Sequence, residues 1–160
     1  MTMEKIKFQS LCYHALFSFG IVVSDLFSKF LAFNYWNNPF RVTRFFSIEV
    51  SLNRGVTWSF FSRSGKAQSI ILIGIISAIL LGFLFFLISE LKRRKSAIPE
   101  MFIFAGGLSN LIDRVWRGGV LDFLSLNIGD WYWPTFNIAD IFIFLGVALL
   151  VIKTLKEVAD

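Results

Sequence analysis

Residues 67–89, AQSIILIGIISAILLGFLFFLIS, are 23 consecutive positions without a charged side chain. About 20 apolar residues in a helix are enough to cross the hydrocarbon core of a bilayer. Isoleucine, leucine and phenylalanine dominate the stretch, and the basic residues KRRK follow it at positions 92–95. The stretch therefore predicts a membrane-spanning helix that ends at a charged loop.

The composition of the whole chain also indicates a membrane protein. The 160 residues are 56 % hydrophobic and only 17 % charged, and the mean hydropathy is +0.66. A soluble domain of this size would expose too much apolar surface, and a disordered chain has the opposite composition. The length allows one domain, so we expect residues 1–160 to form a single integral membrane unit.

Three further stretches have the length and apolar character of membrane spans. The four spans are expected at about residues 8–33, 67–91, 98–117 and 138–155. We therefore predict an all-α membrane protein with four transmembrane helices.

Basic residues at the ends of these spans predict the orientation. With four spans, Lys5, Lys7, the run at 92–95, Lys153 and Lys156 all fall on one side, which the positive-inside rule makes cytoplasmic. Both termini are then cytoplasmic. We interpret the basic run as an orientation signal, with a lipid-binding site as the alternative. The net charge of +5 is spread over these clusters, which argues against a nucleic-acid-binding patch.

The segment between the first two spans has a different periodicity. Apolar and polar residues alternate from Phe46 to Asn53, which is typical of a strand. Residues 56–60 could form a second strand after a turn at Arg54-Gly55. We predict a small extracytoplasmic β-sheet at about residues 41–63, lying on the membrane surface. A structural plug over the helix bundle is the alternative.

The single cysteine and single histidine exclude several kinds of chemistry. Cys12 has no partner for an intramolecular disulfide, and Cys12 and His14 together cannot form a zinc site. Two residues apart on a helix, they point to different sides, so they do not form a nucleophile and base pair. We interpret His14 as an ordinary helix residue and expect no metal and no cofactor.

Six ionisable residues fall at the predicted spans: Asp25, Lys29, Asp113, Arg114, Asp122 and Asp140. Ionisable groups inside a bilayer are costly and mark functional sites. A rise of 1.5 Å per residue places all six in the outer half of the membrane or at its outer surface. The sequence therefore predicts one functional layer near the outer leaflet.

This layer contains four carboxylates and two basic residues, so two carboxylates are left without a cation. Asp25 and Lys29 are spaced i, i+4 and are expected to pair, and Arg114 can neutralise one more acid. We expect Asp122 and Asp140 to be the two acids that remain without a cation. Two carboxyls held together in a poor dielectric share a proton, which is the arrangement of aspartic proteolysis. The same acids could instead form the relay of a small proton-coupled transporter, or a structural ion-pair network.

Four blocks of the sequence match, in order, the motifs of one known family. These are Asp25-x-x-Ser28-Lys29, the block NRGVTWS at 53–59, NLIDR at 110–114 with GGVLDF at 118–123, and FNIAD at 136–140. They resemble the motifs D-x-x-T-K, N-x-G-x-A-F-S, G-N-x-x-D-R with G-x-V-x-D-F, and F-N-x-A-D. The chain thus resembles lipoprotein signal peptidase, or signal peptidase II, a family of bacterial membrane aspartic peptidases.

The resemblance implies roles for the matching residues. Asp122 and Asp140 fall at the catalytic positions. The positions that bind substrate or shape the site are Asn53, Gly55, Asn110, Arg114 and Asn137. The supporting positions are Asp25, Lys29 and Asp113.

The resemblance also implies an activity and a location. The expected enzyme is an aspartic endopeptidase that cuts diacylglyceryl-modified prolipoproteins just before the lipidated cysteine. It is expected in the bacterial cytoplasmic (inner) membrane, in contact with membrane lipid, as a monomer with its active site near the outer leaflet. The chain departs from the family pattern at Ser109, Thr57 and Trp58, where the family has Gly, Ala and Phe.

Overall fold

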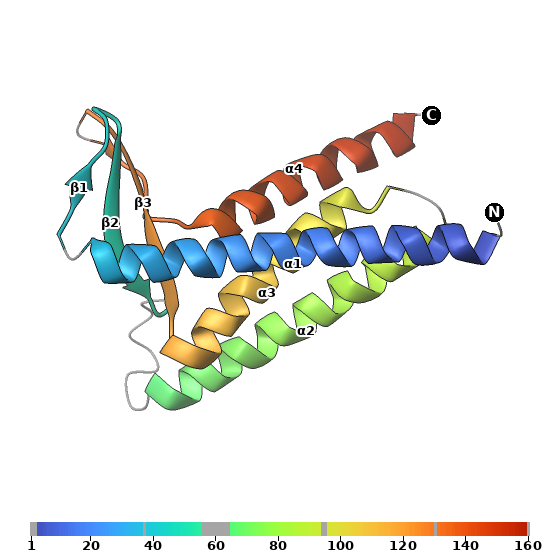
Figure 1. Cartoon of the computed structure of the whole chain (residues 1–160), viewed down its shortest axis with the longest axis horizontal. Coiled ribbons are helices and arrows are strands. Elements are labelled where there is room, and N and C mark those ends of the chain that lie inside the picture. The colour runs from blue at the N-terminus through green and yellow to red at the C-terminus, as the bar shows by residue number, and fades with distance from the viewer. Residues whose placement is uncertain (1–2, 37, 56–64, 94–95, 130, 160) are drawn as a thin grey trace.

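The computed structural model describes residues 3–36, 38–55, 65–93, 96–129 and 131–159. Four helices run alongside one another, and a sheet closes one end of the bundle, opposite the two termini (Figure 1). The helices are α1 (Met3–Tyr35), α2 (Gly65–Lys92), α3 (Ile98–Arg117) and α4 (Ile138–Ala159). The strands are β1 (Phe40–Arg41), β2 (Phe46–Asn53), β3 (Val120–Ile128) and β4 (Trp131–Tyr132).

Helix α3 is the centre of the bundle because it packs against each of the other three helices more extensively than they pack against one another. Its contact with α4 depends on glycine. A Cβ atom added at Gly106 would lie 2.5 Å from the carbonyl oxygen of Ala139, and one at Gly146 would lie 2.8 Å from that of Pro99. Small residues let two helix backbones approach closely where the hydrophobic effect cannot drive association. The first turn of α4 is therefore held tightly against α3.

All four predicted helices are present, but only three have the composition of a membrane span. Within the described residues, Gln9–Tyr35, Ser69–Lys92 and Ile138–Ala159 are long and apolar enough to cross a bilayer. Helix α3 is 20 residues long, but its charged side chains lower its hydropathy. Several of these groups are turned inward, as the 0 % exposure of Glu100 and Asp113 indicates. The fourth span stays a prediction.

The sheet differs from the predicted one in its strand pairing. Its order is β1-β2-β3-β4 and the pairs are antiparallel, with Ser51 opposite Asp122 in the β2–β3 register. Strand β2 confirms the predicted strand at Phe46–Asn53, whereas the proposed partner strand at 56–60 lies outside the described residues. The sheet is not formed only between the first two spans, because β3 and β4 come from the segment between α3 and α4. The prediction missed β3 because its first four residues are all buried and do not alternate, so the alternation is limited to residues 124–128.

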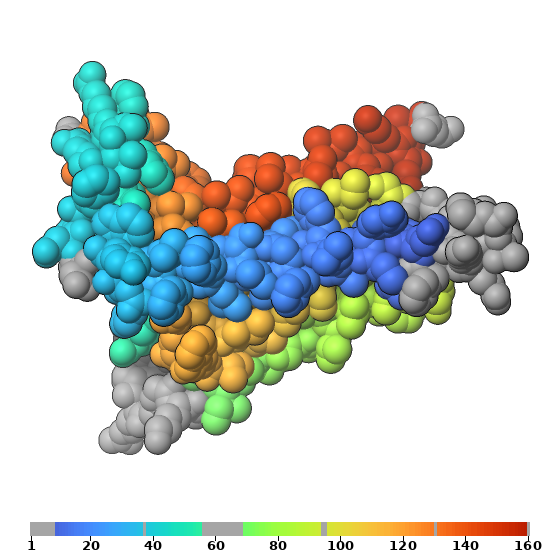
Figure 2. Space-filling view, in the orientation of Figure 1, coloured from blue at the N-terminus to red at the C-terminus, as the bar shows by residue number. Residues whose placement is uncertain are grey.

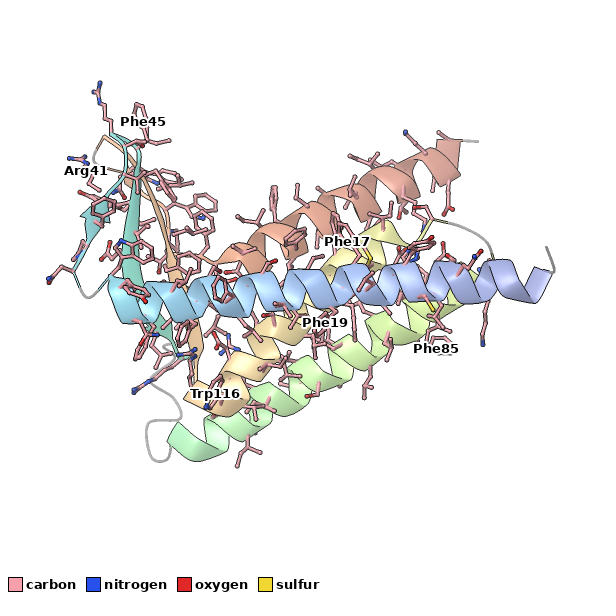
Figure 3. The ribbon with its side chains drawn as sticks, in the orientation of Figure 1. Phe17, Phe19, Arg41, Phe45, Phe85 and Trp116 are labelled. Carbon is pink, nitrogen blue, oxygen red and sulfur yellow. The ribbon has the colours of Figure 1, made fainter. Side chains whose placement is uncertain are left out.

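Apolar side chains cover the outside of the helices. Phe85 on α2 is 77 % exposed and Trp116 on α3 is 76 % exposed, and both point away from the bundle (Figure 3). In the space-filling view, α1 lies across the front of the molecule with α4 on one side and α2 on the other, and α3 is visible on both sides of α1 (Figure 2). Such a surface is suited to lipid and unsuited to water.

A buried ionic cluster lies at the end of the bundle away from the sheet. Lys153 on α4 contacts Glu90 of α2 at 2.6 Å and Glu100 of α3 at 2.9 Å, and it donates to the carbonyl of Ser96 at 3.0 Å. Both glutamates are buried, so a single cation joins three helices.

We predict that Lys153→Met lowers the free energy of unfolding by about 3 kcal/mol, because it leaves two buried carboxylates without their cation. Lys156→Met is the matched control, since Lys156 is an exposed lysine on the same helix. It is expected to change stability by about 0.5 kcal/mol at most. Unfolding in mixed SDS and dodecylmaltoside micelles, followed by circular dichroism, measures both. Equal effects of the two substitutions would contradict the prediction.

Candidate active site

Asp122 on β3 and Asp140 in the first turn of α4 are held by one buried residue, Asn137. The side-chain amide of Asn137 donates to Asp122 Oδ1 at 2.7 Å. Its backbone N–H donates to Asp140 Oδ2 at 3.2 Å, and its Oδ1 accepts from the Asp140 N–H at 2.9 Å. The last two bonds form the reciprocal pattern of a capping box at a helix N-terminus. The capping of α4 therefore fixes the orientation of Asp140.

Each of the two carboxyls accepts a second amide from another element. Asn53 at the end of β2 donates to Asp122 Oδ2 at 3.1 Å, and Asn110 of α3 donates to Asp140 Oδ1 at 2.8 Å. Gly55, with φ of +83°, donates its N–H to Asn53 Oδ1 at 3.0 Å, which turns the NH₂ group of Asn53 towards Asp122. Neutral amides thus hold both carboxyls, and no ion pair to either is found among the described residues.

The environment of Asp122 favours its protonated form. Burial raises the pKa of Asp122, the hydrogen bonds from Asn53 and Asn137 partly offset this, and the nearby charge of Asp140 raises it further. A carboxyl with a raised pKa beside a second carboxyl is suited to hold a shared proton.

Lys29 lies behind the two carboxyls and is completely buried. The predicted pairing with Asp25 is confirmed at 2.7 Å, and Asp113 is 3.3 Å away. Lys29 also donates to Asn110 Oδ1 at 2.8 Å. This bond orients the amide of Asn110 so that its NH₂ group faces Asp140, and the buried lysine therefore acts on the site through Asn110.

The two supporting aspartates each hold the backbone next to a candidate catalytic residue. Asp25 Oδ1 accepts the N–H of Ala139 at 2.8 Å, one residue before Asp140. Asp113 Oδ2 accepts the N–H of Leu121 at 3.0 Å, one residue before Asp122. Charge-assisted bonds of this kind are about twice as strong as neutral ones. Asp25 and Asp113, which both pair with Lys29, therefore fix the positions of the Asp140 and Asp122 carboxyls.

The sequence-based assignment of charges needs one correction, at Arg114. It was expected to neutralise an acid, but it forms no ion pair with the described residues, and its buried Nε has no hydrogen-bond partner there. The second cation on Asp113 is Arg117, at 2.9 Å. The i, i+4 spacing of Asp113 and Arg117, which is the spacing of Asp25 and Lys29, is the signal that would have found it. Arg114 lies near Gly55, where an added Cβ would be 3.4 Å from its Nη1.

Ser109 occupies a position where the motif has glycine, and the structure gives it a partner. Its hydroxyl is buried and donates to Asp25 Oδ2 at 2.7 Å. The substitution therefore adds a hydrogen bond to the Asp25–Lys29 pair. The other two departures, Thr57 and Trp58, lie outside the described residues.

We predict that Ser109→Ala lowers the free energy of unfolding by about 1.5–3 kcal/mol, the range for hydrogen bonds to charged groups. Ser28→Ala is the control, since the Ser28 hydroxyl donates only to the carbonyl of Asp25 on its own helix. It is expected to change stability by about 0.5 kcal/mol at most. Thermal unfolding in detergent measures both, and a Ser109→Ala protein as stable as the wild type would show that this bond is not stabilising.

Comparison with known proteins decides the family. The family profile described as Signal peptidase (SPase) II matches residues 17–156, which include every residue of the site. The chain belongs to the signal peptidase II family.

Relatives in the signal peptidase II family agree over most of their length. The lipoprotein signal peptidase of Francisella tularensis subsp. mediasiatica (strain FSC147) is 35 % identical over 139 residues, covering 84 % of this chain and 86 % of that protein. The lipoprotein signal peptidase of Pseudoalteromonas atlantica (strain T6c / ATCC BAA-1087) is 40 % identical over 117 residues, covering 72 % and 71 %. A bacterial membrane enzyme solved by the in meso method at 1.9 Å resolution superposes with a TM-score of 0.79 and 30 % identity, covering 90 % of this chain and 93 % of that one.

Proposed function

We propose that this signal peptidase II is an aspartic endopeptidase that removes signal peptides from diacylglyceryl-modified prolipoproteins, cutting just before the lipidated cysteine. Family membership supports signal-peptide cleavage and gives no support to proton-coupled transport. The observation that supports the aspartic mechanism is that one residue, Asn137, donates hydrogen bonds to both Asp122 and Asp140.

The proposed reaction uses the two carboxyls as one acid–base unit. The ionised carboxyl takes a proton from water, whose oxygen attacks the carbonyl carbon of the residue before the cysteine. The protonated carboxyl donates to the carbonyl oxygen as the tetrahedral intermediate forms. The C–N bond then breaks, the proton taken from water passes to the amine of the cysteine, and a hydroxyl of the intermediate returns a proton to the carboxyl that had donated one. The products are the signal peptide and the lipoprotein with a free amino terminus.

The position of the carboxyls supports a site near a membrane surface. Asp122 is on β3 and Asp140 is in the first turn of α4. These two elements meet where the helix bundle joins the sheet, opposite the end at which the two termini lie (Figure 1). A diacylglyceryl group must stay in a leaflet, so the bond beside it has to be cut close to that leaflet. We propose a monomer with four spans, α3 included, with both termini cytoplasmic and the sheet at the outer leaflet of the bacterial inner membrane.

Purified protein and a diacylglyceryl-modified prolipoprotein, analysed by gel shift, test this function. The expected result is loss of the signal peptide, with a new amino terminus at the lipidated cysteine. The same precursor without the diacylglyceryl group is the matched control and is expected to remain uncut. An intact lipidated precursor under conditions where the protein is folded would reject the proposal.

Asn53→Ala is expected to move the alkaline limb of the pH profile of the cleavage rate to higher pH. The Asn53 hydrogen bond favours the ionised form of Asp122, so its loss raises the pKa of Asp122 further. The shared proton is then kept to higher pH, and the fall in cleavage rate should begin at higher pH than in the wild type. Ser51→Ala is the control, since the Ser51 hydroxyl contacts Thr135 at 2.7 Å. A limb that stays in place, or moves to lower pH, contradicts this role of Asn53.

A further inference from the structure

A long apolar groove runs between α1 and α2, away from the two carboxyls. It has a volume of about 480 Å³, and α3 forms its floor. In Figure 3, Phe19 lies on the side of α1 that faces α2, whereas Phe17 lies on the opposite side. The groove is lined chiefly by Ala15, Phe19 and Val22 of α1, Leu84 and Ile88 of α2, and Leu108 of α3.

The two polar side chains that line this groove, His14 and Ser18, both come from α1. His14 borders the groove, but its Nδ1–H donates to the carbonyl of Ser10 at 2.8 Å. The walls are otherwise almost wholly hydrocarbon, and they belong to helices with the composition of membrane spans. An occupant must therefore be apolar along the length of the groove.

The size of the groove indicates an acyl chain. A cavity of about 150 Å³ holds one benzene ring, so three times that volume corresponds to a chain of roughly 18 carbons. A helix about 10 Å wide and three turns long occupies more than ~1,000 Å³, which is too large for this space. The groove is therefore matched to lipid rather than to a peptide helix.

The charge at one end of the groove indicates which lipid. Lys92 lies one helical turn beyond Ile88 on the same face of α2, and Arg93 follows it. Both are exposed, at the end of the bundle opposite the sheet. We propose that the groove binds one anionic diacyl phospholipid of the leaflet at this end, with an acyl chain along α1 and α2 and its phosphate at Lys92 and Arg93. This site is separate from the proposed peptidase site.

Native mass spectrometry of the full-length protein from equal mixtures of phosphatidylglycerol and phosphatidylethanolamine tests the proposal. The wild type is expected to retain one phosphatidylglycerol. Each cation at the phosphate should raise the preference for phosphatidylglycerol over phosphatidylethanolamine by about fivefold. Ala15→Phe fills the groove and should remove the bound lipid. Leu16→Phe adds a similar ring on the exposed side of α1 and should keep it.

Two double substitutions of basic residues separate specific binding of the phosphate from general contact with lipid. Lys92→Gln with Arg93→Gln should bring the preference for phosphatidylglycerol close to one. Arg41→Gln with Arg44→Gln removes the same charge from the sheet and should leave the preference unchanged. Retention of lipid by Ala15→Phe, equal binding of the two lipids by the wild type, or displacement of the lipid by a signal peptide would each overturn the proposal. Cleavage of prolipoprotein is a separate readout, so this result does not depend on the peptidase assignment.

Discussion

Asp122→Asn and Asp140→Asn are each expected to lower prolipoprotein cleavage by at least about 10³-fold, because either change removes the acid–base pair. An amide can neither take a proton from water nor give one to the scissile carbonyl. Cleavage is measured by gel shift under single-turnover conditions, so that the chemical step is observed. Unfolding of each variant is measured in parallel, because Asn at 122 would offer one oxygen to the two amides that now donate to Asp122.

Glu49→Gln is the matched control for these two changes. Glu49 is an exposed acid on β2, in the same sheet as Asp122, and the substitution is the same exchange of carboxylate for amide. It should cleave at the wild-type rate. If a folded Asp122→Asn or Asp140→Asn protein did the same, the assignment of the catalytic pair would be wrong, although the family would stand.

The helices and the pair of carboxyls could be predicted because they leave strong signals in the sequence. An uncharged stretch such as residues 67–89 has few interpretations, and Asp25 with Lys29 at i, i+4 identifies its own ion pair. Asp122 and Asp140 emerged as the acids without an assigned cation. In the structure, amides rather than cations hold both of them.

The parts that could not be predicted are those with no signature in residue type. Leu121 and Ala139 contribute to the site only through their backbone N–H groups, which every residue except proline possesses. Strand β3 is buried on both faces at its start, so the alternation that revealed β2 is missing there. The ion pair of Asp113 with Arg117 is different, because its i, i+4 spacing is a signal in the sequence that the assignment of Arg114 passed over.

Lys29→Met is expected to lower the free energy of unfolding by about 3–5 kcal/mol, because it leaves Asp25 and Asp113 buried without their shared cation. It should also reduce cleavage in the protein that remains folded. Without Lys29, Asn110 Oδ1 loses its donor, so the amide that orients Asp140 can turn away. Unfolding in mixed micelles and single-turnover cleavage, corrected for the folded fraction, give the two values separately.

Lys153→Met separates these two effects, because it is the same substitution at the other buried ionic cluster. Lys153 joins α2, α3 and α4 through Glu90 and Glu100, and it has no contact with the amides around Asp122 and Asp140. Both variants should lose stability, but only Lys29→Met should slow cleavage by the folded protein. If both slowed cleavage equally, loosening of the bundle would explain the loss. If neither slowed it, Lys29 would support the fold without positioning Asn110.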